Sequence, residues 1–538
     1  MVLKEVLGGG YYQQTRSSII CYTLYVTEKK KKILIVLAII AVAVFFRFYN
    51  LANVPPGLYP DEAMNGNDAS LALDSGHYSV FYPNNNGREG LFINIQAVFI
   101  KLFGHHAWAL RSVSAIFGVL TVWGLYLLSK ELFDRNIAYL SSFLLAILFW
   151  HVNFSRIGFR AIMLPFILVF EFYFLWRAFK SGEFKNFIYT GIFAGLGVYT
   201  YISYRVSPLI VVLAFANYWL YIKKDFSDSK YDYAKSRLFK GFVVLVMSAV
   251  IVALPILYYF LTNSAQFLSR TGANLSVFSQ EQPLKELAKS VIKTLGMFNF
   301  HGDYNWRHNI SGSPELVWPI GALFMVGFIK EGIHWLKRKH GHFSTAHTLL
   351  FSWFFVMLLP GFLSTEAPHA LRVIGVVPVV VIFAAKGLWW FYEKFQDWLT
   401  AYEPHKSHQH RAVLNLTLII FIFALAVLEF GRYQDTWARN VSEDFNQNYV
   451  DIASYLNSLP QDVPKYVVVN TSGVLVKIPG DPENRSMPVP AQTVMFLTDT
   501  FTYQKQINKN LFYLTEDEFY HVKIDSRSII IYLDNKND

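Results

Sequence analysis

Two adjacent carboxylates, Asp61 and Glu62, follow shortly after the first long apolar run of the chain, residues 33–49. A carboxylate placed where water meets lipid costs free energy unless it is paired or used. Such a group can also take a proton from a neighbouring acceptor as a general base. We therefore expect the other polar motifs of the chain to converge on these two side chains.

Arginine is the second residue type that could do chemistry, in segments that border later apolar runs. Its guanidinium clamps phosphate oxygens through bidentate, charge-assisted hydrogen bonds. Carboxylates and arginines together suit a reaction on a phosphorylated lipid, such as a sugar whose anomeric carbon is attached to a polyprenyl phosphate. The phosphate leaving group already activates that bond, so no nucleotide is needed. The sequence accordingly has no Walker or glycine-rich phosphate loop.

The elements that position these residues are predicted to be membrane helices. Of the 538 residues, 53% are hydrophobic and only 16% are charged, whereas a soluble protein has roughly a quarter charged residues. Apolar runs long enough to cross a bilayer recur along most of the chain. This composition predicts an all-α polytopic membrane protein. The single cysteine excludes an intrachain disulfide, and the dispersed net charge of +10 argues against nucleic-acid binding.

We predict about eleven transmembrane helices. The first follows a cytoplasmic tail, residues 1–32, whose four final lysines hold it inside. Alternation from that start puts the lysine-rich loops inside, in agreement with the positive-inside rule. The ten later spans are expected at 107–128, 136–151, 161–179, 187–202, 206–222, 240–262, 315–333, 346–363, 370–392 and 412–430.

The same alternation puts the mixed polar motifs on the outer side of the membrane. They lie in two long outer loops, 50–106 and 263–314, and in the shorter segments 151–160, 199–205 and 364–372. Two short amphipathic helices, around 63–73 and 90–103, are expected to lie at the interface within the first loop. This one-sided distribution predicts a polar site on the extracytoplasmic face.

The last part of the chain is not membrane-like. Residues 33–430 are predicted to form the membrane domain, and residues 431–538 a small extracytoplasmic α/β domain. Apolar, β-branched segments at 466–470 and 528–532 predict its strands.

Over about residues 33–430, the chain resembles the polyprenyl-phosphate-dependent glycosyltransferases of the GT-C fold. It is most similar to the dolichyl-phosphate-mannose–protein mannosyltransferases (glycosyltransferase family 39) and to the aminoarabinose transferase that modifies lipid A. Each motif alone is weak, but their order and their common side of the membrane are specific. The motifs are Asp61-Glu62, Arg88-Glu89-Gly90, Phe154-Ser155-Arg156, Gly197 to Tyr201 with Arg205, Gly302-Asp303 with Arg307-His308-Asn309, and Pro368-His369 with Arg372.

The resemblance implies roles for the motif residues. The acid after the first span would be the catalytic base or would position the acceptor, which favours Asp61, with Glu62 second. Glu89 is a further candidate acid, because Gly87-Arg88-Glu89-Gly90 stands where related enzymes often have a His-Pro-Pro-like segment. The donor phosphate would be bound by Arg156, Arg160, Arg205 and Arg372. The remaining predicted substrate-binding residues are Arg88, Tyr204, Asp303, Arg307, His308, Asn309, Glu366 and His369.

Structural interpretations compete with these roles. Asp61 could cap an interfacial helix, with Glu62 facing its dipole. Arg156 and Arg160 could extend to lipid headgroups, and Arg205 could anchor an aromatic belt. Glu366, His369 and Arg372 could form a local salt bridge. His301, Asp303 and His308 could ligate a divalent metal, although their spacing fits no fixed template and loop packing is favoured.

The sequence thus predicts a membrane glycosyltransferase. It would move mannose or another hexose or pentose from a polyprenyl-phosphate carrier to a protein, lipid or glycan acceptor at the outer face. The alternative is a transporter or flippase of a lipid-linked substrate. Transporters tend to place ionisable residues near the midplane, often in paired repeats, whereas here such residues gather at one face and no repeat is seen. A scaffold presenting the C-terminal domain is a third alternative.

Overall fold

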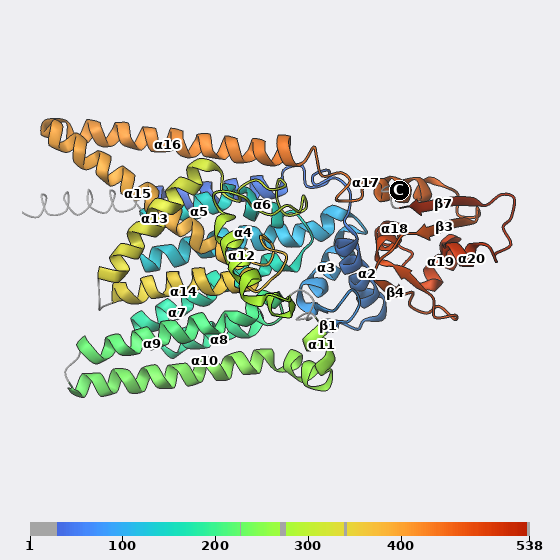
Figure 1. The fold of residues 1–538 in the computed structure, drawn as a ribbon, viewed down its shortest axis with the longest axis horizontal. Helices are drawn as coiled ribbons and strands as arrows, with labels where there is room; N and C mark the ends of the chain where they lie inside the picture. The colour runs from blue at the N-terminus through green and yellow to red at the C-terminus, as the bar shows by residue number, and fades with distance from the viewer. Residues whose placement is uncertain (1–29, 226–227, 270–275, 338–341, 535–538) are drawn as a thin grey trace, which may run out of the picture.

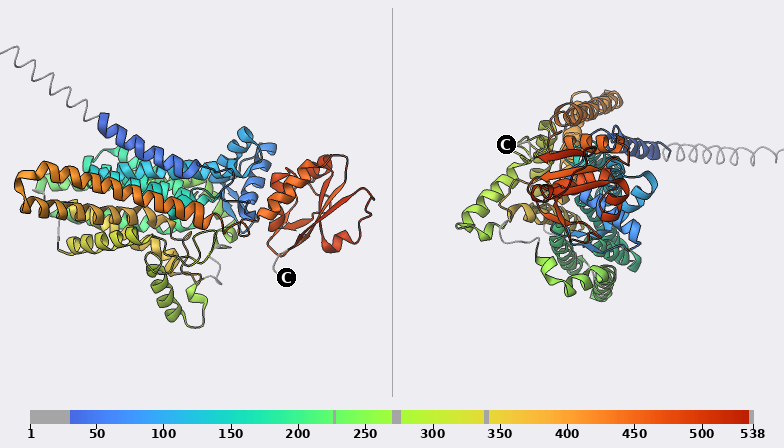
Figure 2. Two further views of the ribbon diagram at one scale, coloured as in Figure 1. Left: turned by 90° about the horizontal axis from the view of Figure 1, so that it is seen from above. Right: turned by 90° about the vertical axis from the view of Figure 1, so that its right-hand side faces the viewer.

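The computed structural model describes residues 30–225, 228–269, 276–337 and 342–534. The predicted tail, residues 1–32, therefore lies almost entirely outside the described residues. A long bundle of helices carries a smaller α/β unit at one end (Figures 1 and 2). The first described helix spans 30–48. The rest of the bundle consists of α4 (Ala107–Leu132), α5 (Arg135–Ile147), α6 (Phe149–Phe154), α7 (Met163–Ser181), α8 (Phe184–Gly197), α9 (Pro208–Asp225), α10 (Asp228–Thr262), α12 (Pro283–Gly296), α13 (Trp318–Lys337), α14 (His342–Phe362), α15 (Val377–Tyr402) and α16 (Ser407–Gly431).

Six helical stretches among the described residues are long and apolar enough to cross a membrane. The chain is therefore a multi-pass membrane protein, as its composition predicted. Two shorter apolar helices, α5 and α3 (Gly90–Phe103), lie beside them. Whether all eleven predicted spans cross the bilayer stays a prediction. The six stretches are Ala107–Leu132, Arg160–Ser181, Asp232–Thr262, Ser344–Phe362, Ile374–Tyr402 and Pro404–Trp437.

The bundle packs closely where small residues face one another. At the crossing of α13 and α15, a Cβ added to Gly327 would lie 1.8 Å from the carbonyl oxygen of Phe383. A Cβ added to Gly387 would lie 2.1 Å from the carbonyl oxygen of Leu323. Only glycine lets the two backbones approach this closely, which is a common device in membrane bundles.

The residues after α16 form parallel and antiparallel strands around short helices. A three-stranded parallel sheet has the order β6 (Leu511–Thr515), β3 (Lys465–Asn470), β7 (Ile529–Asp534). In its register, Val467 faces Tyr513 on one side and Ile531 on the other. Both predicted strand segments are therefore present as strands. The other elements are β4 (Leu475–Lys477) paired with β5 (Ser486–Pro488), and the helices α17 (Gln447–Ser458), α18 (Gln492–Leu497), α19 (Tyr503–Lys509) and α20 (Glu516–Phe519).

Helix α2 (Pro60–Ser75) connects the bundle to this unit. Pro60 at its first position and two acids in its first turn favour its start, and Gly76 ends it in the left-handed conformation with φ 70°. Its two sides pack against α3 and α18, and Met64 belongs to the apolar core of the C-terminal unit. The expectation of an amphipathic helix lying at the interface is wrong for α2, because polar as well as apolar side chains are buried around most of its surface.

Polar contacts strengthen this connection. Thr493 Oγ1, on α18, donates to the carbonyl oxygen of Leu58 over 2.9 Å, just before α2 begins. Asn67 Nδ2 donates to the side-chain and main-chain oxygens of Gln492 over 2.9 and 3.1 Å. The C-terminal unit thus holds both α2 and the chain segment that leads into it.

Candidate active site

A cavity of about 160 Å³ opens beside the first turn of α2. Its wall combines α2 with segments that are distant in sequence: the β1–β2 hairpin (Phe81–Tyr82 and Arg88–Glu89), the 3₁₀ turn η1 (Arg160–Ile162) and the chain around residue 371. Several motifs that the sequence analysis singled out therefore meet at one place. The lining residues are Asp61, Asn65, Asn85, Arg88, Phe159, Arg160, Ala161, Tyr201 and Leu371.

Asp61 is the carboxylate of this cavity. It lies in the first turn of α2, where the positive end of the helix dipole stabilises negative charge. Its Oδ1 accepts a hydrogen bond from Asn85 Nδ2 over 2.5 Å. The interpretation that Asp61 caps the helix is wrong, because the N-cap is Tyr59 and no side-chain cap hydrogen bond is formed. The side chain is thus available to the cavity.

Arg160 is the guanidinium of the same cavity. Its Nε donates to Glu89 Oε2 over 2.6 Å, and its Cζ lies 5.7 Å from the centre of the Tyr201 ring. Its Nη2 is buried without a hydrogen-bond partner among the described residues. A buried donor without a partner is costly, so Arg160 is prepared for a ligand that brings an oxygen acceptor.

Arg88 is also at the cavity wall, but protein groups hold it. It forms a buried ion pair with Asp68, and its Nη1 donates to Asn65 Oδ1 over 2.7 Å. Both partners lie on α2, so the β1–β2 hairpin is fastened to the helix that carries Asp61. Arg88 therefore adds positive charge beside the cavity from a fixed position.

Glu62, the neighbour of Asp61, points to a different environment. Its carboxylate accepts from Arg111 Nε over 3.0 Å, from Arg111 Nη2 over 3.2 Å and from the Gly158 amide over 2.7 Å. Arg111 also donates to the carbonyl oxygens of Pro55 and Gly57 over 2.7 and 2.8 Å. Both charged side chains have no solvent exposure. The structure therefore places Glu62 in a buried ion pair that joins α2 to α4, away from the cavity lining.

Two more of the predicted residues, Arg156 and Tyr204, lie away from the cavity lining. Arg156 has no solvent exposure and donates to Tyr433 Oη and to the carbonyl oxygens of Phe46 and Val54 over 2.8–3.0 Å. The hydroxyl of Tyr204 donates to Glu171 Oε2 over 2.8 Å inside the bundle. For Arg156, extension to lipid headgroups is wrong, since its donors point to protein groups.

Arg205 and Arg372 are more accessible. The guanidinium of Arg205 lies 5.8 Å from the centre of the Phe260 ring. Burial lowers the pKa of Arg205, although the negative charge of Glu89 partly offsets this effect. Arg372 forms an ion pair with Glu366, as the salt-bridge interpretation expected, and it follows Leu371 of the cavity wall. Of the four arginines predicted to bind phosphate, only Arg160 thus lines the cavity itself.

A second polar cluster is formed by Asp303, His308 and His369, in the 299–309 loop and the 364–372 segment. Asp303 Oδ2 accepts from His308 Nδ1 over 2.9 Å and from the Ala370 amide over 2.8 Å. Burial alone would raise the pKa of Asp303, but the hydrogen bond and charge of His308, together with His369 and the Asn305 amide, lower it. Burial lowers the pKa of His369 to about 3. The cluster joins the 299–309 loop to the 364–372 segment.

The same cluster has the composition of a metal site. One oxygen and two imidazole nitrogens lie within 4.8 Å of one another, and histidine and carboxylate are common ligands of divalent metals. His301, the third residue in the sequence-based candidate, does not belong to it; His369 does. The hydrogen bonds of Asp303 equally support loop packing, so the residues fit both interpretations.

The remaining predicted residues support this loop beside the cavity. The guanidinium carbon of Arg307 lies 4.0 Å from the centre of the Tyr59 ring, next to Asp61. Asn309 Nδ2 donates to the Ser313 carbonyl oxygen over 2.5 Å. The backbone oxygens of Arg307 and His308 accept from Asn153 Nδ2, both over 3.0 Å. These contacts are structural, and they link the loop to the start of α2.

Sequence reasoning gave no role to Asn65, Asn85, Tyr201 or Arg111, although Tyr201 belongs to one of the motifs. One signal could have identified Arg111: a guanidinium inside an apolar run is costly unless it is paired, and Glu62 was one of several acids on the predicted outer side that could pair with it. Asn85 and Asn65 carried no such signal, because asparagine is common in turn-rich loops and helix starts for local reasons.

Comparisons with known proteins agree with this architecture. Residues 91–259 match the family described as dolichyl-phosphate-mannose-protein mannosyltransferase. No curated protein matches the chain. Among solved structures, ArnT from Cupriavidus metallidurans bound to undecaprenyl phosphate aligns with a TM-score of 0.52 at 14% identity, over 92% of this chain and 89% of that chain.

The second similar structure is the oligosaccharyltransferase AglB from Archaeoglobus fulgidus in complex with an inhibitory peptide and a dolichol-phosphate. It aligns with a TM-score of 0.53 at 14% identity, over 92% of this chain and 70% of that chain. In its apo form, the Archaeoglobus oligosaccharyltransferase aligns with a TM-score of 0.51 at 15% identity, over 81% of this chain but only 62% of its own length. These alignments confirm that the chain has the GT-C fold predicted from its motifs.

Proposed function

We propose that this GT-C protein is a membrane glycosyltransferase that moves a sugar from a polyprenyl-phosphate carrier to an acceptor on the extracytoplasmic side. The observation that carries the proposal is that Asp61 and Arg160 line one cavity. A general base and a phosphate-binding cation are the two groups that this transfer needs. The undecaprenyl phosphate and dolichol-phosphate bound to the similar structures support the polyprenyl carrier.

In this proposal Arg160 binds the donor phosphate. Charge-assisted hydrogen bonds from a guanidinium to phosphate oxygens are short and strong, and Nη2 of Arg160 has no hydrogen-bond partner to lose within the described ranges of the chain. Glu89 holds the other edge of the guanidinium through Nε and so acts as a positioning residue. As the bond to the sugar breaks, negative charge grows on the phosphate, and Arg160 stabilises it where it develops.

Asp61 is the proposed base. An acceptor oxygen or nitrogen attacks the anomeric carbon and forms the new glycosidic bond, while the bond from that carbon to the phosphate oxygen breaks. The acceptor proton goes to the Asp61 carboxylate, and the polyprenyl phosphate leaves with the bonding electrons. Asn85, which donates to Asp61 over 2.5 Å, fixes the orientation of the carboxylate. One displacement of this kind inverts the configuration at the anomeric carbon.

Arg372 and Arg205 are proposed to help at the edge of the cavity. The ion pair of Arg372 with Glu366 is partly exposed, and pairs of that kind contribute at most about 1 kcal/mol. A lipid phosphate can therefore compete with Glu366 for Arg372. The acceptor is a protein, a lipid or a glycan, and the C-terminal unit next to α2 would contact it.

The proposal is tested by transfer from polyprenyl-phosphate sugars by the purified full-length protein. We expect Asp61→Asn to lower kcat by about a hundredfold or more, the effect of losing a general base. Asp74→Asn is the matched control, since it makes the same chemical change on the same helix at a partly exposed ion pair with Lys505. Equal turnover by wild type and Asp61→Asn would overturn the assignment of the base. Absence of transfer by the wild type with every such donor would overturn the function.

A further inference from the structure

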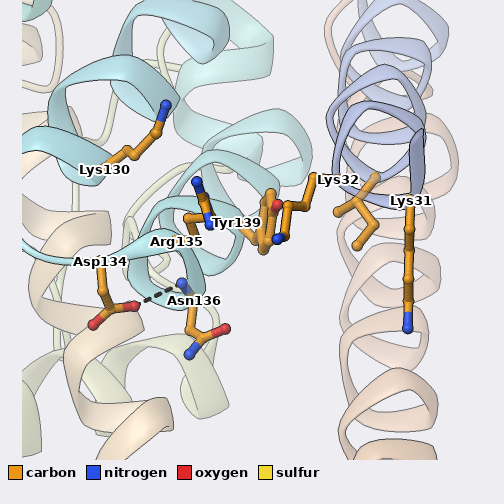
Figure 3. A pocket seen from close by; sticks show the side chains of 8 residues that line it. Lys31, Lys32, Lys130, Asp134, Arg135, Asn136 and Tyr139 are labelled. Atoms are coloured by element: carbon orange, nitrogen blue, oxygen red, sulfur yellow. Dashed lines mark hydrogen bonds between the residues drawn. The ribbon is translucent and has the colours of Figure 1, made fainter. Parts of the chain in front are cut away.

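A second, larger cavity is lined by the start of the 30–48 helix and the turn from α4 to α5, which lie at the end of the bundle opposite the C-terminal unit (Figures 1 and 2). Its volume is about 600 Å³, and it opens between the start of the 30–48 helix and the turn from α4 to α5. Lys32 extends from its helix toward Tyr139 and Arg135 on α5, while Lys31 lies along its own helix (Figure 3). Four cationic side chains gather around this hollow: Lys31, Lys32, Lys130 and Arg135.

The single acid at this cavity does not neutralise these charges. Asp134 is the N-cap of α5, and its Oδ1 accepts from the amides of Asn136 and Ile137 over 2.7 and 3.2 Å (Figure 3). Its charge is thus directed to the helix N-terminus. Within the described part of the chain, Lys31, Lys130 and Arg135 form no ion pair.

Some other cations at this end of the bundle are paired. Lys180 pairs with Glu131 over 3.2 Å, Lys185 with Glu183 over 3.2 Å, and Lys394 with Asp397 over 3.7 Å. Lys31, Lys130 and Arg135 differ from these in that they surround a cavity and form no ion pair among the described residues. Their arrangement is that of an anion site, to which Tyr139 adds a buried hydroxyl at the wall.

Apolar residues next to the cavity indicate which anion it takes. On the helix that carries Lys31 and Lys32, the following residues Ile33, Leu34 and Leu37 are 51%, 64% and 57% exposed, and Ile35 lines the cavity itself. A soluble phosphate would gain nothing from this surface, whereas the acyl chains of a phospholipid would cover it.

We propose that this cavity binds the headgroup phosphate of an anionic phospholipid, whose acyl chains lie along the 30–48 helix. Basic pockets between helix ends are suited to such headgroups. The lipid would bridge the 30–48 helix and the α4–α5 turn, which contribute its cations separately. The site is far from the cavity of Asp61, and the proposal does not depend on the proposed transferase activity.

The test uses the full-length protein in nanodiscs of phosphatidylcholine with and without phosphatidylglycerol, and counts retained phosphatidylglycerol by native mass spectrometry. Each Lys or Arg near the surface adds about 1 kcal/mol of attraction to anionic lipid. The double variant Lys130→Gln with Arg135→Gln should therefore bind phosphatidylglycerol roughly 30-fold more weakly than wild type. The control, Lys185→Gln with Lys394→Gln, loses the same charge at this end and should bind as wild type does.

Several outcomes would overturn the proposal. One is equal weakening in the control, which would mean that overall charge, not the cavity, holds the lipid. Another concerns thermal unfolding of the protein in pure phosphatidylcholine with inorganic phosphate added. If the phosphate protects the protein as well as phosphatidylglycerol does, the cavity is a site for a free anion. If the double variant does not fold, Lys31→Gln with Lys130→Gln replaces it, with the same expected loss.

Discussion

Glu62 and Arg111 form an ion pair without solvent exposure, with Arg111 Nε 3.0 Å from Glu62 Oε2. Successive residues of an α-helix point about 100° apart, so the side chains of the two adjacent acids of α2 lie in different environments. Glu62 is buried against α4, and Asp61 lines the cavity. The pair fixes the rotation of α2 about its axis, and that rotation presents Asp61 to the cavity.

The first prediction concerns this pair. Glu62→Gln or Arg111→Met should each lower the free energy of unfolding by about 3–5 kcal/mol, because each leaves one charge buried without its partner. Thermal unfolding in detergent measures the effect. Asp74→Asn, at a partly exposed pair, should cost less than about 1 kcal/mol. A double variant Glu62→Leu with Arg111→Met that is as unstable as the sum of the single changes would contradict the pairing.

The second prediction separates Arg160 from Glu89. Arg160→Gln should lower kcat/KM for the lipid donor by roughly 10- to 100-fold, since a hydrogen bond to a charged group is worth about 1.5–3 kcal/mol. Glu89→Gln keeps an acceptor for Arg160 Nε and should cost less, mainly through a higher KM. The exposed Arg439, paired with Asp435, offers Arg439→Gln as a control. A larger loss of kcat in Glu89→Gln than in Asp61→Asn would instead make Glu89 the base.

The third prediction is a pH dependence at the contact between the outer loop and the C-terminal unit. His105 contacts Ser70 Oγ over 2.9 Å and Asp499 over 3.3 Å. Burial lowers the pKa of His105, and the positive charges of Lys505 and Lys509 lower it further, whereas the negative charge of Asp499 raises it. The folded protein therefore binds fewer protons here than the unfolded chain does, so stability falls as pH decreases through about 6.5, the unfolded value.

Thermal unfolding of wild type and His105→Gln between pH 8 and pH 5, roughly the range in which a histidine titrates, checks this. The stability of the variant should depend less on pH than that of the wild type. Relative to its own stability at pH 8, roughly the upper end of this range, the variant should be at least as stable as the wild type at the acidic end. Parallel curves for the two proteins would show that His105 does not titrate as inferred.

The fourth prediction concerns the cluster of Asp303, His308 and His369. Asp303→Asn weakens the acceptor for His308 Nδ1 and the Ala370 amide, so hydrogen exchange should become faster in 299–309 and 364–372. The same measurement on the wild type with and without EDTA addresses metal binding. If EDTA leaves the exchange unchanged, the result supports loop packing. If EDTA makes exchange faster in these two segments alone, the three side chains hold a cation.

Much of the architecture could be predicted from local signals. Apolar run length predicted membrane helices, the short apolar, β-branched segments predicted β3 and β7, and the motif order predicted the GT-C fold. The environment of single polar residues could not be predicted in the same way. Glu62 meets Arg111 across 49 residues, and Arg156 meets Tyr433 across 277. Whether a charge at a helix end is buried depends on such distant partners, which no local pattern contains.

The fifth prediction follows from the contact of Thr493 with Leu58. Thr493→Val removes the donor to the Leu58 carbonyl oxygen at similar side-chain volume, and one such hydrogen bond is worth about 1 kcal/mol. We expect kcat to fall roughly fivefold, because the segment leading to Asp61 loses an anchor. Thr471→Val, in the loop after β3, is the control. Unaltered kcat in Thr493→Val would mean that α18 does not support the catalytic helix.

Because α2 contributes Met64 to the C-terminal core and carries Asp61 only three residues earlier, the two parts of this molecule cannot be exchanged as separate modules. A chimaera that keeps the bundle and replaces everything after α16 would expose apolar side chains of α2 and leave Asp61, the proposed base, on an unsupported helix. Engineering a new acceptor preference would therefore require grafting α2, the β1–β2 hairpin and α18 together.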